Sequence, residues 1–405
     1  MMNTRGRSTV VVPIAITLVI QSLVSMAAVS LPVFMPAASA ELNFPSSYVG
    51  LFVTLIYLGA TVSSPASGYF VDRYGPICVS QICLLLSAVG LAVVSIGSVP
   101  VMMLGALIIG FGYGPVTPAS AQLLVRTTPP HAMSLSFSIK QTGVPLGGAA
   151  AGAIVPHLVL LSGWRTAGVA VSGVCVLLML FLHPFRKHYD RDLAGITRFS
   201  YTHMFKSLKM IFSEHALRQI AVASFFFVTM QLFLISFLVT YLAEDIGMTL
   251  VRAGIMLSAA QSAGIIGRIA WGALADRYHN SRFLLAMLGI VMAVMSVVAA
   301  LFSPAWPHPA ILAVCVLFGS VAIGWNGVYL AEVTRLVRPE YAAMATGGSL
   351  FFTYCGVLMG LPAFSLIVDK TGSYAAGFYC AAVATSVCGV ILWLSRSSGA
   401  RNVKT

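Results

Sequence analysis

Two basic residues stand inside long apolar stretches of this 405-residue chain. Lys140 lies in SFSIKQTGVPLGG, directly before a run rich in glycine and proline, and Arg268 lies in SAGIIGRIAWGALADR. A charge at the centre of a membrane is costly, so intramembrane cations mark functional sites. An arginine fork suits a carboxylate through two parallel hydrogen bonds, and a lysine adds a point charge. The two residues together predict binding of a small organic anion.

The segments that must position these cations are apolar and long. Hydrophobic residues make up 59% of the chain, charged residues make up 8%, and the mean hydropathy is +0.93. The apolar residues come in blocks of about 20, which is the length that crosses a hydrocarbon core of about 30 Å. The sequence therefore predicts an all-α integral membrane protein with twelve transmembrane helices. The expected spans are 10–39, 47–70, 77–97, 101–124, 134–158, 166–182, 217–242, 251–274, 282–302, 310–333, 342–368 and 374–394.

The chain repeats a short motif in its two halves. GYFVDRYGP (68–76) ends the second expected span, and WGALADRYHN (271–280) ends the eighth. Such a repeat indicates two six-helix halves in parallel orientation. We expect an N-terminal half over 1–182, a cytoplasmic connector over 183–216, a C-terminal half over 217–394 and a cytoplasmic tail over 395–405.

The positions of the cations predict the orientation. Most of the 23 Lys and Arg residues fall in links on one side of the expected spans, and the positive-inside rule makes that side cytoplasmic. Both termini are then cytoplasmic, in the inner membrane of a bacterium. This topology explains the net charge of +12 without a nucleic-acid partner. The connector mixes basic residues with Phe and Met, and two interpretations stay open: a segment lying on anionic lipids or a solvated tether.

With its repeat and its spans, the chain resembles the major facilitator superfamily over essentially its whole length. GYFVDRYG is similar to the loop signature that follows the second helix in that family, but Pro76 and Ile77 stand where basic residues are usual. The second copy has His279 in place of the glycine. The resemblance implies a two-half fold and gating roles for Asp72, Arg73, Asp276 and Arg277, with the loop aspartate capping a neighbouring helix.

A second charged pair lies near the end of the tenth expected span. Glu332 and Arg335 are three residues apart, so they share one helix face. We expect them to form a charge network with Arg277, and proton carriage by Glu332 stays open as an alternative.

In the superfamily the fifth and eighth helices face each other across the central cavity, which would place Lys140 and Arg268 on one wall. Each lies about 9 Å inside its expected span at 1.5 Å per residue. The competing interpretation is snorkelling of either side chain to the headgroups. The arginine and Gly272 also resemble the eighth helix of monocarboxylate and oxalate-type carriers, although the first span has Gln21 and no lysine.

Several further residues are candidates for this site. Gly143, Pro145, Gly147 and Gly148 are expected to let the Lys140 helix bend and pack closely. The candidate cavity-lining residues, each of which can equally be a packing residue, are Tyr113, Gln141, Gln231, Gln261, Trp325, Asn326, Tyr329 and Tyr354.

These features predict a secondary active transporter that takes up a monocarboxylate-like anion together with protons, by alternating access. Lys140 or the substrate itself is the expected proton carrier. Proton-driven efflux of drug-like compounds is the main alternative, and a non-transporting membrane sensor is a further one. No nucleotide-binding, nucleophile or metal-ligand motif is evident, so we expect no enzyme activity, cofactor or metal. The expected partners are substrate, protons and membrane lipids, and a monomer suffices for the fold.

Overall fold

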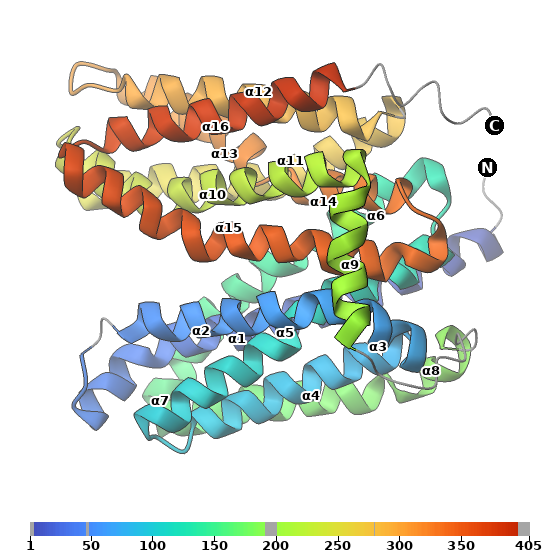
Figure 1. Cartoon of the computed structure of the whole chain (residues 1–405). Coiled ribbons are helices and arrows are strands. Elements are labelled where there is room, and N and C mark those ends of the chain that lie inside the picture. Colours follow the sequence, from blue (N-terminus) through green and yellow to red (C-terminus); the bar gives the residue numbers. More distant parts are fainter. Residues whose placement is uncertain (1–3, 46–47, 191–200, 279, 396–405) are drawn as a thin grey trace. The chain divides into compact units, whose positions relative to one another are not determined.

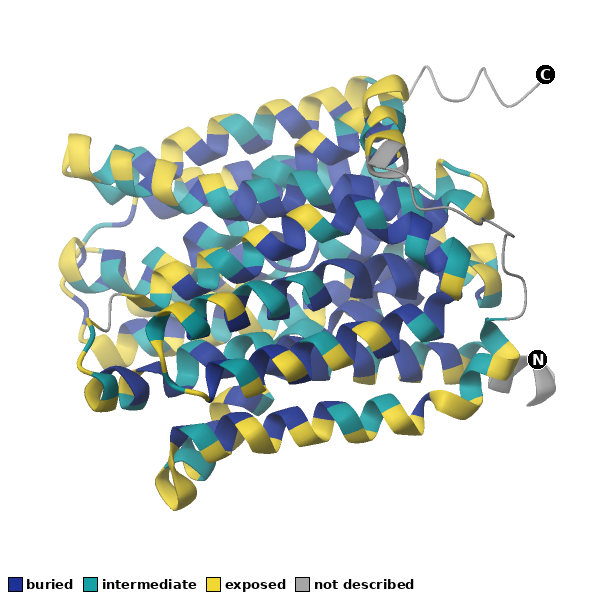
Figure 2. Ribbon diagram, turned by 60° about the horizontal axis from the view of Figure 1, so that its bottom comes forward, coloured by how far each residue is buried: buried dark blue, intermediate teal, exposed yellow. Residues whose placement is uncertain are grey.

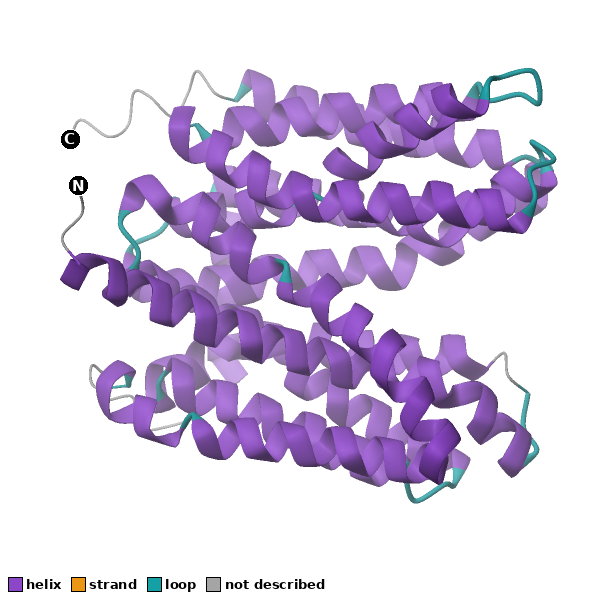
Figure 3. Cartoon of the chain, turned by 180° about the vertical axis from the view of Figure 1, so that it is seen from behind, coloured by secondary structure: helices purple, strands orange, loops and turns teal. Residues whose placement is uncertain are grey.

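The computed structural model describes residues 4–45, 48–190, 201–278 and 280–395. Helices and loops account for all of these residues, and none of them forms a strand (Figure 3). Parts of two predictions lie outside the described residues: positions 191–200 of the connector, and the tail beyond Ser395.

Twelve spans are confirmed once one long helical run is divided. Eleven runs of the described residues are long and apolar enough to cross a membrane, but the run Pro130–Phe181 has 52 residues. At 1.5 Å per residue that is about 78 Å, far more than a hydrocarbon core of about 30 Å. Gly163 interrupts the run at φ 81° and ψ 162°, a conformation that glycine adopts without strain. The fifth and sixth spans therefore meet at Gly163.

The element bounds follow the chain in order. The first six spans contain α1 (Thr4–Leu42), α2 (Tyr48–Ser63), the 3₁₀ helix η1 (Ser64–Ala66), α3 (Ser67–Tyr74), α4 (Pro76–Val94), α5 (Val99–Thr127), η2 (Pro130–Ala132), α6 (Met133–Gln141) and α7 (Gly143–Phe181). The connector contains α8 (His183–Tyr189) and α9 (Tyr201–Ser213). The last six spans contain α10 (His215–Glu244), α11 (Leu250–Tyr278), α12 (Ser281–Ala300), α13 (His308–Ala322), α14 (Asn326–Arg335), η3 (Pro339–Tyr341), α15 (Ala342–Thr371) and α16 (Tyr374–Leu394).

The chain forms two compact units, whose helices Figure 1 labels. Unit 1 comprises Met1–Pro129, Ile139–Ile211 and Val337–Tyr354, and unit 2 comprises Pro130–Ser138, Phe212–Leu336 and Cys355–Thr405. Each unit thus takes a short segment from the other half of the sequence. The half boundaries at 182 and 217 remain predictions.

Close helix packing in unit 1 depends on small residues. A Cβ atom at Gly147 of α7 would overlap the carbonyl oxygen of Ser22 in α1, and one at Gly143 would crowd Leu18 and Gln21. The two backbones approach closely because these positions have no side chain, as is usual where membrane helices pack. This contact fixes the start of α7 against the middle of α1.

In unit 2 the helices α11 and α13 pack through glycines in the same way. A Cβ atom at Gly267 of α11 would overlap the carbonyl oxygen of Ser320 in α13.

Burial alternates around each helix, with buried faces toward neighbouring helices (Figure 2). Large apolar side chains on the outer faces are exposed, for example Leu160 and Ile266, as a lipid environment allows.

Candidate functional site

Lys140 lies within unit 1 and is fully buried, with 0% of its surface exposed. Its ammonium Nζ donates hydrogen bonds to Gln21 Oε1 at 2.7 Å, Thr117 Oγ1 at 2.8 Å and Gln141 Oε1 at 3.0 Å. The Thr117 hydroxyl in turn donates to Gln21 Oε1 at 3.0 Å. The side chain is therefore held among helices and does not snorkel toward the surface. We call these four residues the Lys140 cluster.

Interruptions in two helices place the members of the Lys140 cluster. Pro145 lacks an N–H group for the carbonyl of Gln141, so α6 ends at Gln141 and α7 begins at Gly143. Lys140 therefore stands in the last turn of α6, just before the break. In α5, Thr117 stands between Pro115 and Pro118, which remove two more intrahelical hydrogen bonds. Such interrupted helices often line transport routes.

A small cavity of about 160 Å³ lies beside the Lys140 cluster in unit 1. It is lined by Ser25, which accepts a hydrogen bond from Gln21 Nε2 at 3.2 Å, and by the rings of Tyr57 and Tyr113. Tyr57, Tyr113 and Tyr354 form a triangle with ring centroids 6.1–6.2 Å apart. Tyrosine rings offer apolar faces and hydroxyl groups together, which suits a small organic molecule.

Arg268 lies in unit 2 and is also buried, with 3% of its surface exposed. Its Nε donates to the carbonyl oxygen of Ile323 at 2.9 Å. Ile323 follows the end of α13 at Ala322, and α14 begins only at Asn326. The tenth span is thus broken in its middle, and the break presents a carbonyl oxygen to the guanidinium. Arg268 is positioned by an interrupted helix, as Lys140 is.

Three polar side chains adjoin this break, and we call them with Arg268 the Arg268 cluster. Gln231 Oε1 accepts hydrogen bonds from Trp325 Nε1 and from Asn326 Nδ2, both at 3.1 Å. Trp325 is fully buried and its ring lies 5.2 Å from that of Tyr329. The guanidinium, an amide pair and an indole N–H therefore gather around one break in unit 2.

Among the candidates in unit 2, Gln261 lies apart from the Arg268 cluster. It is exposed, and no hydrogen bond joins its side chain to any other residue within the described part of the chain.

A charged cluster in unit 2 surrounds Asp276, whose side chain is 8% exposed. Its carboxylate accepts from the backbone N–H groups of Ser134 at 2.9 Å and Leu135 at 2.8 Å, at the N-terminus of α6. Arg335 Nη2 adds an ion pair at 2.8 Å. The same guanidinium donates to Ser281 Oγ and to the carbonyl oxygen of Pro130. Asp276 thus caps α6, the helix that carries Lys140.

Glu332 lies near this cluster, but its cationic neighbours differ from the expected one. Arg335 and Arg282 are the cations that act on it electrostatically. Arg277, the residue predicted for this network, is exposed at the end of α11. A cavity of about 520 Å³ adjoins the side chains of Glu332, Arg282 and Arg335.

The first motif copy is arranged differently in unit 1. Asp72 is half-buried, and it makes no hydrogen bond or ion pair with any other residue in the described ranges. Arg73 Nη1 lies 3.2 Å from the Tyr69 hydroxyl, and its guanidinium lies over the Tyr74 ring. The N-terminus of α15 is instead capped by Gln122, whose Oε1 accepts from Ala343 N at 3.1 Å. The gating residues of the two halves are therefore not chemically equivalent.

Asp190, which follows α8, makes a further helix cap within unit 1. Its carboxylate accepts from Ile77 N at 2.9 Å and Cys78 N at 3.0 Å, at the start of α4. Burial raises the pKa of the Asp190 carboxyl, although the two N–H groups and the Arg186 guanidinium act in the opposite direction. The connector is thereby attached to α4 at the position where the loop signature departs from its usual basic residues.

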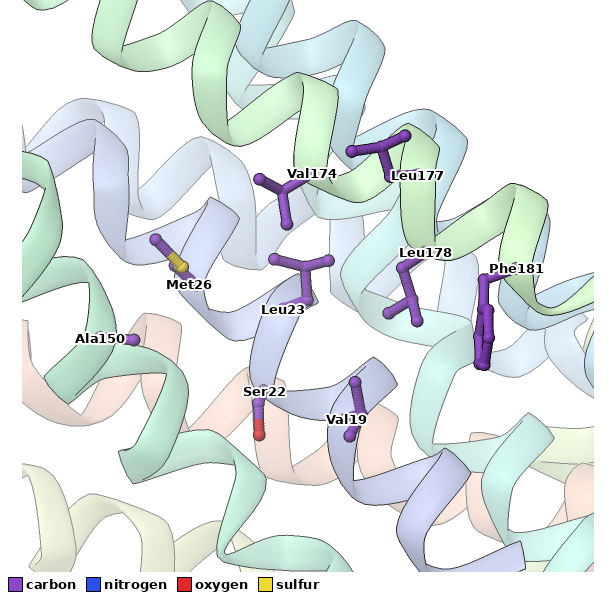
Figure 4. A pocket seen from close by; sticks show the side chains of 9 residues that line it. All are labelled: Val19, Ser22, Leu23, Met26, Ala150, Val174, Leu177, Leu178 and Phe181. Carbon is purple, nitrogen blue, oxygen red and sulfur yellow. The ribbon is translucent and has the colours of Figure 1, made fainter. Parts of the chain in front are cut away.

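A groove of about 540 Å³ between α1 and α7 differs from these polar sites (Figure 4). Its walls are apolar side chains such as Leu23, Val174 and Phe181, and the Ser22 hydroxyl already donates to Leu18 O. Val174 and Phe181 are exposed, so the groove faces lipid. It is not suited to a small anion.

Sequence reasoning missed several partners of the predicted residues. Gln21 and Thr117 were not proposed as partners of Lys140, although polar residues are unusual in apolar spans and that signal could have identified them. Arg282 is indistinguishable in sequence from a cation that sets topology, and Asp190 lies in a connector without a recognisable pattern.

Comparisons with known proteins agree with this architecture. The family model described as Major Facilitator Superfamily matches residues 17–354. An uncharacterized MFS-type transporter of Mycobacterium tuberculosis is 24% identical over 313 residues, which are 75% of this chain and 67% of that protein. The hexuronate transporter of Bacillus subtilis is 19% identical over 386 residues, 86% of each chain. The match spans about two thirds of the length of the first curated relatives.

Solved structures give the same result for the fold. The transporter FucP in the outward conformation has a TM-score of 0.76 at 17% identity, covering 95% of this chain and 99% of its own. The human organic anion transporter MFSD10 has a TM-score of 0.76 at 13% identity, and the match covers 96% of this chain and 100% of that protein. Because the family model covers most of the chain and the solved structures share its fold, this chain belongs to the Major Facilitator Superfamily of membrane transporters.

Proposed function

We propose that this chain takes up a small monocarboxylate-like anion together with protons, by alternating access. The observation that carries the proposal is the pair of buried cations, Lys140 at 0% and Arg268 at 3% exposure, each held at a helix interruption. Burying a charge is costly unless a ligand or a dipole compensates it. The neighbouring amide, hydroxyl and carbonyl oxygens supply part of that compensation, and a substrate carboxylate adds to it during transport.

The neighbours of both cations indicate which carboxylates fit. Amide, hydroxyl and indole groups surround them: Gln21, Thr117 and Gln141 in the Lys140 cluster, and Gln231, Trp325 and Asn326 in the Arg268 cluster. Such groups hydrogen-bond hydroxyl groups well. A carboxylate that also carries hydroxyl groups, such as a hexuronate, is therefore the first candidate. The name of the Bacillus subtilis relative supports this choice.

Proton coupling follows from the membrane potential. Moving one negative charge into a negative-inside cell opposes the potential by about 2.3 kcal/mol per 100 mV, and a co-transported proton cancels that charge. We place the protein in the inner membrane of a bacterium as a monomer with both termini cytoplasmic, in accord with the cation distribution.

The test is uptake by purified protein in liposomes that are alkaline inside, against labelled short carboxylates and hexuronates. Wild type is compared with Arg268→Ala and with Arg252→Ala, which removes an exposed arginine from the same helix α11. We expect one anion to accumulate, accumulation to be lost in Arg268→Ala, and Arg252→Ala to behave as wild type. Expulsion of a cationic dye with no movement of any carboxylate would overturn the proposal in favour of drug efflux.

A further inference from the structure

Glu332 of α14 is buried without a polar partner. Its residue surface is 8% exposed, and its carboxylate makes no hydrogen bond and no ion pair with any residue that the structure describes. Burial disfavours an ionised carboxylate in that position, because it loses water and gains no direct ligand, although the charges of Arg335 and Arg282 act in the opposite direction. A protonated carboxyl group avoids most of this penalty. The surroundings of Glu332 in this conformation therefore fit its neutral form.

A cavity with polar and charged residues around it gives this carboxyl group a route for protons. The cavity of about 520 Å³ is lined by Pro130, His131, Asn280, Ser281, Arg282, Glu332 and Arg335. A water molecule takes about 30 Å³ in the liquid, so the cavity has room for a connected group of waters. Glu332 is thus buried in the protein and still reachable by water.

Charged groups face Glu332 from each neighbouring helix. Arg282 of α12 donates to Ser395 Oγ at 2.7 Å and to Gln219, but its buried Nε has no acceptor in the described structure. Arg335 lies one turn further along α14, and His131 of η2 lines the same cavity.

Two more helices pack near this region. Asp276 of α11 already binds Arg335. In the first turn of α10, Arg218 is bonded to His215 and to the carbonyl oxygen of Phe212. The local charge around Glu332 is therefore positive, and Arg335 is the cation shared with another carboxylate.

We propose that Glu332 is the proton-binding residue of this chain and that its ionisation competes with Asp276 for the Arg335 guanidinium; this rests on the proposed proton-coupled function. Glu332 releases its proton to cavity water and becomes a carboxylate. Arg335 lies at i+3 on the same helix face, where it can pair with that carboxylate. Reprotonation of Glu332 returns Arg335 to Asp276.

The exchange reaches the substrate site through one short helix. Asp276 holds the N-terminus of α6 through Ser134 N and Leu135 N, and Lys140 stands in the last turn of the same nine-residue helix. When the Arg335 guanidinium leaves Asp276 to pair with Glu332, Asp276 loses the cation that neutralises it. The carbonyl oxygen of Pro130 loses its hydrogen-bond donor at the same time. Ionised Glu332 therefore loosens the α6 cap, and protonated Glu332 stabilises it.

The first test detects the proton itself and needs no substrate. Infrared difference spectra of the purified protein in liposomes are recorded between about pH 5 and about pH 8, a range in which an ordinary glutamate with a pKa of about 4.3 is already ionised. We expect the C=O stretching band of a protonated carboxyl to disappear as the pH rises. The loss of band intensity with rising pH should be smaller in Glu332→Gln than in wild type and should be retained in Glu332→Asp, since other carboxyl groups, such as that of Asp190, contribute the remainder. Glu340→Gln, which removes an exposed carboxylate paired with Arg338, should leave it unchanged.

An equal loss of band intensity in Glu332→Gln and in wild type, or a wild-type spectrum without the band, overturns the inference. Thermal unfolding of each variant checks that it is folded. If Glu332→Gln does not fold, the spectrum of Glu332→Asp still tests the inference.

Uptake then separates this inference from the proposed function. We expect Glu332→Gln to lose its response to the pH gradient, so that accumulation of the anion with the gradient equals accumulation without it. If the band behaves as expected but wild type moves no carboxylate, the proposed substrate is wrong and the proton site stands. If wild type and Glu332→Gln both accumulate the anion with the gradient, the proton site is wrong and the substrate stands.

Discussion

A buried lysine ammonium needs oxygen atoms to replace the water it has lost. At Lys140 these oxygens come from Gln21, Thr117 and Gln141, on three different segments of unit 1. The sequence was sufficient to predict that Lys140 and Arg268 lie inside apolar spans, and both are buried in the structure; their part in substrate binding stays a prediction. The sequence did not identify Thr117 or Ile323 as partners, since those contacts depend on how α5 and α13 are interrupted.

The contribution of these oxygens is testable with a variant of nearly unchanged shape. Thr117→Val removes one of the three acceptors of Lys140 and leaves a buried donor less well satisfied, at a cost of about 1–3 kcal/mol. We expect the kcat/KM of anion uptake to fall by about tenfold, since about 1.4 kcal/mol corresponds to that factor. The measurement is initial uptake rate against substrate concentration in liposomes.

Thr127→Val is the matched control, because Thr127 is also in α5 and its hydroxyl donates only to Leu123 O. Equal losses in the two valine variants would mean that threonine hydroxyls in α5 act through helix stability alone.

At the scale of elements, the site depends on helices that are interrupted and that approach closely. The repeat and the apolar blocks were enough to predict twelve spans. Helix length and composition leave Pro130–Phe181 as one candidate span, and the backbone break at Gly163 divides it into two. The cap made by Asp190 and the exchange of short segments between units were not predictable, because residues distant in sequence make them.

Gly147 and Gly148 provide a direct test of the contact between α7 and α1. Gly147→Ala places a methyl group against Ser22 O, and overpacking of this kind costs about 1–3 kcal/mol. Gly148 has no atom within 4 Å of a Cβ, so Gly148→Ala should be neutral or slightly stabilising. We expect a lower Tm for the first variant only, measured by thermal unfolding in detergent. An unchanged Tm in both would mean that α1 and α7 are not in close contact.

The Asp190 cap is expected to stabilise unit 1. Asp190→Ala removes the acceptor of both Ile77 N and Cys78 N, which costs about 0.5–2 kcal/mol at a helix N-terminus. Asp190→Asn keeps one side-chain oxygen and should lower the Tm less. If alanine and asparagine unfold at the wild-type temperature, Asp190 does not hold the connector to α4.

At the scale of the whole molecule, orientation follows from the distribution of cations and not from any contact. The sequence alone predicts an orientation, because the positive-inside rule depends on loop charge, and this orientation stays a prediction. Substrate identity was not predictable, since one fold hosts many transport functions and the decisive groups are few.

Orientation is testable by labelling from one side of the membrane. In a variant with the seven native cysteines replaced, a membrane-impermeant thiol reagent should label Ala305→Cys in intact cells. Glu340→Cys, which is also at an exposed position, should be labelled only after the cells are opened. The reverse pattern would place both termini outside.

The most direct measurement is equilibrium binding of the transported anion and of its uncharged counterpart to the purified protein by calorimetry. For a hexuronate, the counterpart is the corresponding neutral sugar, and the proteins are wild type, Lys140→Gln, Arg268→Gln and the exposed-site control Arg252→Gln. We predict that wild type and the control prefer the anion by at least about tenfold, and that each buried-site variant loses this preference. Equal binding of the anion and the neutral sugar to wild type would contradict recognition of a carboxylate by the two buried cations.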